Sequence, residues 1–141
     1  MKVKSIMCRP VIRIGAEEPV AVAARTLTQY NIGALPVCAT DGRVCGMVTD
    51  RDIVTRCLAA GKSPERTAVR EIMTSGVVSV TPETEVSMAA AIMGKSRVRR
   101  LPVVEKERLC GMVSLADISQ KDFCIYDAGD ALAQITENII G

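Results

Sequence analysis

Aromatic residues are almost absent from this chain of 141 residues, which has one Phe, two Tyr and no Trp. Proteins that bind single-stranded nucleic acid stack bases on aromatic side chains. The net charge of +2 is also too small to indicate general nucleic-acid binding. We therefore expect no nucleic-acid partner, and a core built from Val, Ile, Leu, Ala and Met.

The chain also has no His, and its six Cys residues never occur in a C-x-x-C spacing. Zinc-ligand clusters of the familiar kinds are therefore not expected. A nucleophile-elbow Gly-x-Ser-x-Gly and a Walker A loop are missing too. We predict no catalytic residues, no metal ligands and no resident cofactor, although Asp52 or Asp117 could in principle act as a base.

The sequence shows neither the apolar stretch of a signal peptide nor an apolar window long enough for a membrane span. We therefore expect a cytoplasmic protein with no membrane partner, in which the cysteines stay reduced. Two of them, Cys38 and Cys45, flank Asp41-Gly42, a two-residue hairpin signal. Such a turn would place these cysteines directly opposite each other, where they either pack as thiols or oxidise to a strained disulfide.

What the chain does contain is an internal repeat, with the second copy displaced by 66 residues. The displacement falls by one residue in the hairpin. The matching segments are Val3-Lys4-Ser5-Ile6-Met7 with Val69-Arg70-Glu71-Ile72-Met73, Leu35-Pro36-Val37 with Leu101-Pro102-Val103, and Cys45-Gly46-Met47-Val48-Thr49 with Cys110-Gly111-Met112-Val113-Ser114.

The repeat divides the chain into four parts. A unit of about 60 residues is marginally stable alone, so we expect the two repeats to pack face to face about a pseudo-twofold axis. The predicted parts are a first repeat at 1–61, a linker at 62–68, a second repeat at 69–121 and a C-terminal helical tail at 122–141.

Each repeat predicts the order strand, helix, strand, strand, helix, which is an α+β fold made of two βαββα units. β-branched runs at 11–14 and 77–80 predict the first strands. In the second repeat, Thr81 as N-cap and Pro82 at the first helical position predict the start of a helix. In the first repeat, a second helix is predicted over about 49–60.

The motifs that carry a family resemblance span 31–37 and 46–52 in the first repeat, and 98–103 and 111–117 in the second. With these motifs in two ordered copies, the chain resembles the CBS (cystathionine-β-synthase) repeat family. The resemblance implies a paired module, expected to form a homodimer, with clefts between the repeats. In the family such clefts bind AMP, ADP, ATP, S-adenosylmethionine or related adenosyl ligands, so the resemblance implies a ligand of this class.

A hydroxyl and a carboxylate recur three residues apart, as Thr49 with Asp52 and as Ser114 with Asp117. Three residues are nearly one helical turn, so both groups lie on one side of a helix. A carboxylate can accept the hydroxyl protons of a ribose. Spacing alone favours a capping box at each helix start, whereas the resemblance favours a ligand site.

Basic residues of the second repeat suggest that the two sites differ. The resemblance implies that Arg99 and Arg100 reach the phosphates of a nucleotide held at Thr49 and Asp52, with Arg51 as a further contact. The equivalents of this arginine pair in the first repeat are Gly33 and Ala34, which carry no charge. The alternatives are a strand edge protected by charge and an exposed ion pair of Arg51 with Asp50.

Apolar residues near both hydroxyl–carboxylate pairs could line slots for the base, although most of them fit a core equally well. We therefore predict a regulatory module that binds an adenosine-containing small molecule and signals in trans to an unidentified protein. The alternatives are a ligand-free dimerisation module and an enzyme. The predicted slot residues are Val11, Ile12, Leu35 and Pro36 for the first site, and Val77, Val78, Leu101 and Pro102 for the second.

Overall fold

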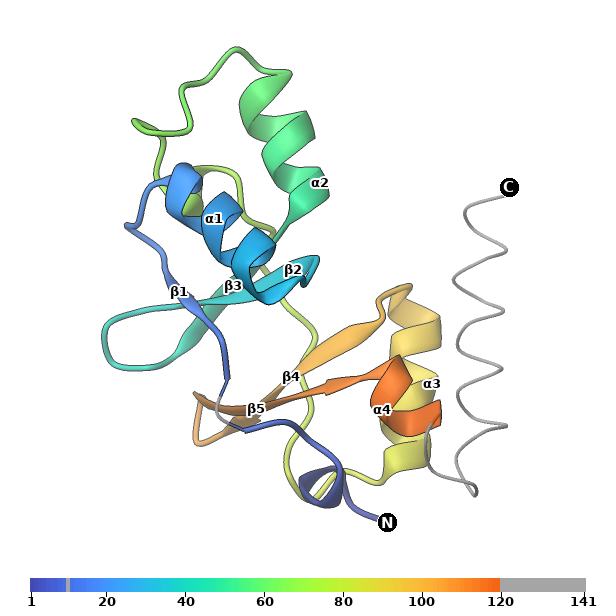
Figure 1. The fold of residues 1–141 in the computed structure, drawn as a ribbon. Helices are drawn as coiled ribbons and strands as arrows, with labels where there is room; N and C mark the ends of the chain where they lie inside the picture. Colours follow the sequence, from blue (N-terminus) through green and yellow to red (C-terminus); the bar gives the residue numbers. More distant parts are fainter. Residues whose placement is uncertain (10, 120–141) are drawn as a thin grey trace. The chain divides into compact units, whose positions relative to one another are not determined.

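The structure, a computed structural model, describes residues 1–9 and 11–119 (Figure 1). The chain divides into two compact units. Unit 2 is Ile12–Val77, and unit 1 joins Met1–Val11 to the chain from Val78 onward. Helices and strands occur together in both units, which confirms the predicted α+β class. The tail predicted at 122–141 lies outside the described residues.

The boundaries of the units differ from those of the sequence repeats, because the first segment of each repeat packs with residues of the other repeat. Val3 and Ile6 belong to the buried core of unit 1, beside residues of the second repeat. Their equivalents Val69 and Ile72 belong to the core of unit 2, beside residues of the first repeat. Each unit is therefore completed by a segment exchanged between the repeats.

Unit 2 contains a three-stranded sheet in the order β1-β2-β3, with β1 parallel and β3 antiparallel to β2. Val20, Ala23 and Leu27 of α1 are buried in its core, at a spacing that places them on one face of the helix. The elements are β1 (Ile14–Gly15), α1 (Val20–Tyr30), β2 (Ala34–Cys38), β3 (Val44–Thr49), α2 (Asp50–Asp52), the π-helix η2 (Ile53–Leu58) and the 3-10 helix η3 (Val69–Glu71).

Unit 1 is built around an antiparallel hairpin of β4 and β5. Buried Val86, Ala89, Ala90 and Met93 project from α3 into its core. The elements are the 3-10 helix η1 (Val3–Ser5), α3 (Val86–Ser96), β4 (Arg100–Glu105), β5 (Arg108–Ser114) and α4 (Leu115–Ser119). No helix among residues 1–9 and 11–119 is long and apolar enough to cross a membrane.

The first strand of each repeat is shorter than predicted. Of the run at 11–14 only Ile14 belongs to a strand, β1, and the run at 77–80 is reduced to one bridge, between Val80 and Val103. The unit boundaries explain the difference, since the chain passes from one unit to the other within each run. β-branched residues form a strand only where a partner strand is present.

The start of α3 also differs from the prediction, because Thr81 is not its N-cap. The helix begins at Val86. Before it, Lys4 donates its backbone N–H to the Pro82 carbonyl at 3.0 Å, and Val3 donates to the Thr84 carbonyl at 2.8 Å. The exchanged N-terminal segment thus holds this stretch as a turn, and Thr81 caps nothing in α3.

The hairpin of unit 2 has a three-residue loop, not the predicted two-residue turn. The Ala39 N–H donates to the Arg43 carbonyl at 2.8 Å, and Gly42 has a φ of 90°, a conformation that favours glycine. Asp41 favours this loop because its carboxylate accepts the Arg43 backbone N–H at 3.1 Å and the Arg43 Nε at 2.8 Å.

This loop shifts the strand register, so the prediction that Cys38 lies directly opposite Cys45 is wrong. Cys38 pairs with Val44, and the register shift that follows Val37 leaves Cys45 in a bulge. The Cys45 thiol donates to the Val37 carbonyl at 3.3 Å. Unit 1 repeats the arrangement with Cys110, whose thiol donates to the Val103 carbonyl at 3.3 Å. Burial raises the pKa of the Cys45 and Cys110 thiols, which favours the protonated donors.

Candidate functional site

Both hydroxyl–carboxylate pairs form reciprocal capping boxes. Asp52 donates its N–H to Thr49 Oγ1 at 3.0 Å, and Thr49 donates its N–H to Asp52 Oδ2 at 3.0 Å. At Ser114 and Asp117 the same two bonds measure 3.1 and 2.9 Å. The capping reading of the spacing is therefore confirmed. In each box one carboxylate oxygen, Oδ1, lies outside the reciprocal pair.

The surroundings of the two carboxylates differ. Asp52 is buried, with 8% of its surface exposed, and its Oδ1 lies 3.8 Å from the Arg56 Nε. Asp117 is half-buried, and the Cys8 Sγ lies 3.8 Å from its Oδ2 and 4.0 Å from its Oδ1. The first carboxylate thus has a cation beside it, and the second has a thiol.

The thiol at the second carboxylate is poorly ionised. Partial burial raises the pKa of Cys8, and the negative charge of Asp117 raises it further, against an opposing effect of Arg100. The carboxylate therefore keeps a neutral neighbour around neutral pH.

The strand register places the predicted phosphate ligands within unit 1. Arg100 lies directly across the β4–β5 ladder from Ser114, whereas Ala34 lies across β2–β3 from Thr49. Arg99 and Arg100 are both exposed. Assigning this arginine pair to the site at Thr49 joins residues of different units and stays a prediction.

The predicted base slots contain core residues as well as exposed ones. Leu35 and Leu101 are 0% and 1% exposed and belong to the cores of their own units. Val78 is 43% exposed. The remaining members are buried Pro36 and Pro102 and half-buried Val11, Ile12 and Val77. The slots stay a prediction, and the unit boundaries fall within them, after Val11 and after Val77.

Sequence reasoning missed two neighbours of the carboxylates. Arg56 follows Asp52 by four residues, a spacing that places side chains together on a helix, so the sequence contained a signal for it. Cys8 had no such signal, since its approach to Asp117 depends on the exchanged N-terminal segment. The predicted contact Arg51 is exposed, and its backbone N–H donates to Asp50 Oδ1 at 2.8 Å.

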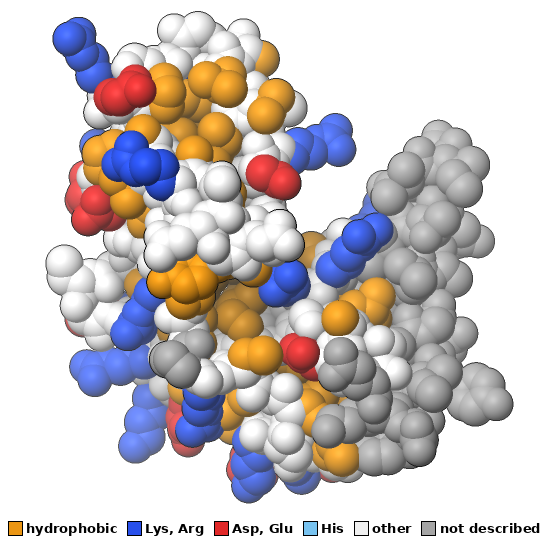
Figure 2. Space-filling model, in the orientation of Figure 1, with side chains coloured by type: hydrophobic (Ala, Val, Ile, Leu, Met, Phe, Trp, Pro, Cys, Tyr) orange, Lys and Arg blue, Asp and Glu red, His pale blue; other side chains and the backbone are white. Residues whose placement is uncertain are grey.

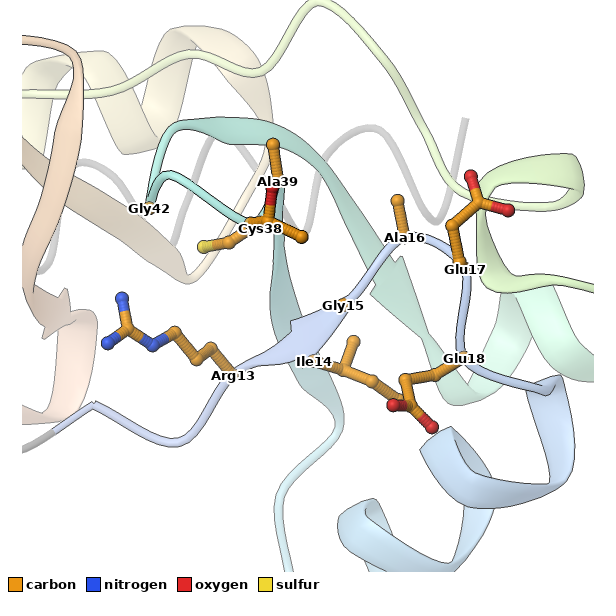
Figure 3. A pocket seen from close by; sticks show the side chains of 10 residues that line it. Arg13, Ile14, Gly15, Ala16, Glu17, Glu18, Cys38, Ala39 and Gly42 are labelled. Carbon is orange, nitrogen blue, oxygen red and sulfur yellow. The ribbon is translucent and has the colours of Figure 1, made fainter.

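A separate cavity of about 600 Å³ lies in unit 2 (Figure 3). It is at the turn end of the hairpin, around Cys38 and Gly42, whereas Thr49 pairs with Ala34 at the other end. Burial raises the pKa of the Cys38 thiol, and the nearby Arg13 opposes this shift. The cavity is lined by Arg13, Ile14, Gly15, Ala16, Glu17, Glu18, Cys38, Ala39, Thr40 and Gly42.

Possible metal ligands are scattered in the part of the chain that the structure describes. Across residues 1–9 and 11–119, no group of three Cys, Asp or Glu side chains could hold a metal ion.

Comparison with known proteins gives a consistent assignment. The CBS domain matches residues 3–59 and 69–122. The CBS domain-containing protein YhcV of Bacillus subtilis is 35% identical over 98% of this chain and 97% of its own length.

Two solved structures have the same fold. Hypoxic Response Protein I, known from Mycobacterium tuberculosis and solved with two coordinated zinc ions, has a TM-score of 0.80 and 36% identity, over 85% of this chain and 98% of the other. The CBS domain pair of MJ0100, in complex with 5′-methylthioadenosine and S-adenosylmethionine, has a TM-score of 0.76 and 31% identity, over 85% and 94%. The chain therefore belongs to the CBS-domain family, as a protein with two CBS repeats.

Proposed function

We propose that this protein is a regulatory module that binds an adenosine-containing ligand through Asp52 and Asp117. One observation carries the proposal: each carboxylate uses one oxygen in its capping box, while Oδ1 lies outside it. A carboxylate oxygen held in this way can accept a ribose hydroxyl without rearrangement of the helix start. The adenosyl ligands of the MJ0100 domain pair support this ligand class.

Binding, not catalysis, is the proposed activity. The shift in conformation or assembly that a ligand produces would be transmitted to a separate protein. A ligand can drive such a shift only through different affinity for the two states.

A thermal-shift panel tests the ligand class on protein freed of bound small molecules. AMP, ADP, ATP, S-adenosylmethionine, 5′-methylthioadenosine and NADH form the panel. A ligand at 100 times its dissociation constant should stabilise the protein by about 2.7 kcal/mol. The absence of a shift with every compound would favour a ligand-free scaffold, and turnover of any of them would favour an enzyme.

Asparagine variants locate the site. Asn keeps an oxygen that can accept the cap N–H, but replaces Oδ1 by an NH₂ group and removes the charge. Calorimetry should show lost binding at one site in Asp52→Asn and at the other in Asp117→Asn. Asp50→Asn is the matched control, because Asp50 is an exposed acid in the same turn as Asp52. Equal losses in Asp50→Asn and Asp52→Asn would contradict the assignment.

Exposed apolar side chains favour a second proposal, that the protein is a homodimer. Tyr30 at the end of α1 is 48% exposed, and Val54 and Leu58 of η2 are each 55% exposed. Figure 2 shows uncovered apolar side chains on this part of unit 2. Light scattering should show a dimer that Val54→Glu with Leu58→Glu converts to a monomer, and a monomeric wild-type protein would contradict the proposal.

A further inference from the structure

One arginine of unit 2 contacts both the candidate carboxylate and a distant backbone segment. The Arg56 Nε lies 3.8 Å from Asp52 Oδ1. Its Nη1 donates to the Ile72 carbonyl at 3.4 Å and to the Met73 carbonyl at 3.3 Å. A single guanidinium group therefore contacts both the Asp52 carboxylate, which we propose binds the ribose, and the chain that follows η3.

That chain, which we call the exit segment, is Ile72–Thr74. Thr74 exchanges two backbone hydrogen bonds with Met47 of β3, at 2.9 and 2.8 Å. Met73 packs on Gly46, where an added methyl group would lie 2.6 Å from the Met73 Sδ. Unit 2 ends three residues later, at Val77. The exit segment thus lies just before the point where the chain passes from unit 2 to unit 1.

Arg56 lies within the π-helix η2 (Ile53–Leu58), where Ala59 donates its N–H to the Val54 carbonyl, five residues earlier, at 2.8 Å. Turns of this kind are rare and frequently occur at functional sites. The helix places the Arg56 side chain within reach of both Asp52 and the exit segment.

The contacts of Arg56 are individually weak. Its hydrogen bonds, at 3.4 and 3.3 Å, are longer than the normal range, and its ion pair with Asp52 involves a side chain that is 53% exposed. Arginine forms shorter and stronger charge-assisted bonds with phosphate. A phosphate near Asp52 would therefore compete effectively for the guanidinium group.

We propose that Arg56 is a positioning residue that responds to the phosphate of a bound ligand and thereby controls the exit segment. The proposal rests on the proposed function, in which Asp52 holds the ribose. A nucleotide at Asp52 draws the guanidinium group away from the Ile72 and Met73 carbonyls, and the exit segment opens more readily. An uncharged nucleoside leaves these contacts in place.

A purely structural role predicts something different. Arg56 would then only satisfy the carbonyls that follow η3, as basic side chains do at helix ends. Removing it would loosen the exit segment by the same factor with any ligand, and AMP and adenosine would have equal effects. The comparison of nucleotide with nucleoside therefore separates the two roles.

Hydrogen exchange measured by mass spectrometry tests the proposal, on peptides covering 69–77 in the full-length protein. The states are ligand-free, saturated with adenosine and saturated with AMP, and calorimetry confirms saturation in each sample. Local opening sets the exchange rate of such amides. In the wild type, the exchange rate of the exit segment should be about five times higher with bound AMP than with bound adenosine, since about fivefold is the low end of ordinary coupling between sites.

Variants make the result specific. Arg56→Gln should exchange rapidly in all three states, with no difference between AMP and adenosine. Arg56→Lys keeps the charge and should retain part of the difference, which protects the test if Arg56→Gln folds poorly. The control is Arg25→Gln, the same change at an exposed position of α1 in the same unit, and it should behave as the wild type.

Two outcomes overturn the inference alone: equal exchange with bound AMP and bound adenosine, or an AMP effect that persists in Arg56→Gln. If neither AMP nor adenosine binds in the calorimeter, the inference fails, whereas the proposed function fails only if no compound of the thermal-shift panel binds.

Discussion

Two equivalent glycines provide a quantitative test of the exchanged segments. A methyl group at Gly46 would lie 2.6 Å from the Met73 Sδ and 2.8 Å from the Thr74 carbonyl oxygen. At Gly111 it would lie 2.6 Å from the Met7 Sδ and 3.1 Å from the Met7 Cγ. The close approach, and not the backbone angle, requires glycine at both positions. The obstacle at Gly46 includes backbone, whereas at Gly111 it is a flexible side chain.

This difference sets the expected magnitudes. Replacing glycine by alanine stabilises a protein by about 0.4–1 kcal/mol through the unfolded chain, and overpacking costs about 1–3 kcal/mol. At Gly111 the adaptable Met7 side chain can move, so we expect a net loss of about 0–1 kcal/mol. At Gly46 the Thr74 carbonyl already accepts the Met47 N–H at 2.9 Å, so the backbone must shift, and we expect a net loss of about 2 kcal/mol.

Urea unfolding followed by circular dichroism measures both losses, with an unchanged m-value as the sign that only stability has changed. For a chain of this size, each kcal/mol corresponds to about 2–4 °C in melting temperature. A double-mutant cycle identifies the obstacle. In a Met7→Ala background, Gly111→Ala should become neutral or stabilising. In a Met73→Ala background, Gly46→Ala should remain destabilising, because the Thr74 carbonyl is still in place.

Equal losses of stability in Gly46→Ala and Gly111→Ala would refute this reasoning, since they would mean that the Thr74 backbone and the Met7 side chain move aside equally easily. A stabilising Gly46→Ala would refute the exchanged segment itself, because the segment supplies both obstacles at that position.

Three further predictions concern ionisation and redox chemistry. The raised pKa of Cys8 should make alkylation of its thiol slow at pH 8, and Asp117→Asn should accelerate the alkylation by lowering the pKa of Cys8. A ligand bound at Asp117 should protect the Cys8 thiol from alkylation, as measured by peptide mapping. Lys2 and the N-terminal amine lower the pKa of Glu85. The stabilising contribution of the Glu85 carboxylate should therefore be complete above its ordinary pKa of about 4.5 and lost as the pH falls through the lowered pKa. Glu85→Gln should flatten the acidic part of a plot of the urea midpoint against pH. Intact-mass analysis under mild oxidant should show no loss of two protons from a bond between Cys38 and Cys45, because these residues are not directly opposed, and rapid formation of that bond would contradict the register.

Local chemistry made much of the site predictable from sequence. Thr49 with Asp52 and Ser114 with Asp117 form their boxes from residues three positions apart, so the spacing alone contained the geometry. The second helix, predicted over about 49–60, ends at Leu58, close to Gly61, whose φ of 74° is a conformation that favours glycine.

The exchange of segments could not be predicted, because the repeat is nearly symmetric in pattern. Val3 and Val69 have the same apolar neighbours in sequence, so either would fit the core of either unit. The pattern shows that a face is buried but not against which copy. The prediction of a two-residue hairpin turn was wrong for another reason. The Asp41 carboxylate accepts hydrogen bonds from Arg43 and favours a longer loop, and the Asp-Gly signal does not take the residue after the glycine into account.

The exchange also bears on how the protein is made. Unit 2 is one continuous stretch, Ile12–Val77, and can fold as soon as that stretch has left the ribosome. Unit 1 cannot fold until the second repeat has been synthesised, because the Val3 N–H donates to the Thr84 carbonyl and Lys4 forms an ion pair with Glu83. The segment around Val3, although synthesised before unit 2, is therefore placed after it, and we expect nascent chains to carry a folded unit 2 while this segment remains accessible to proteases and chaperones.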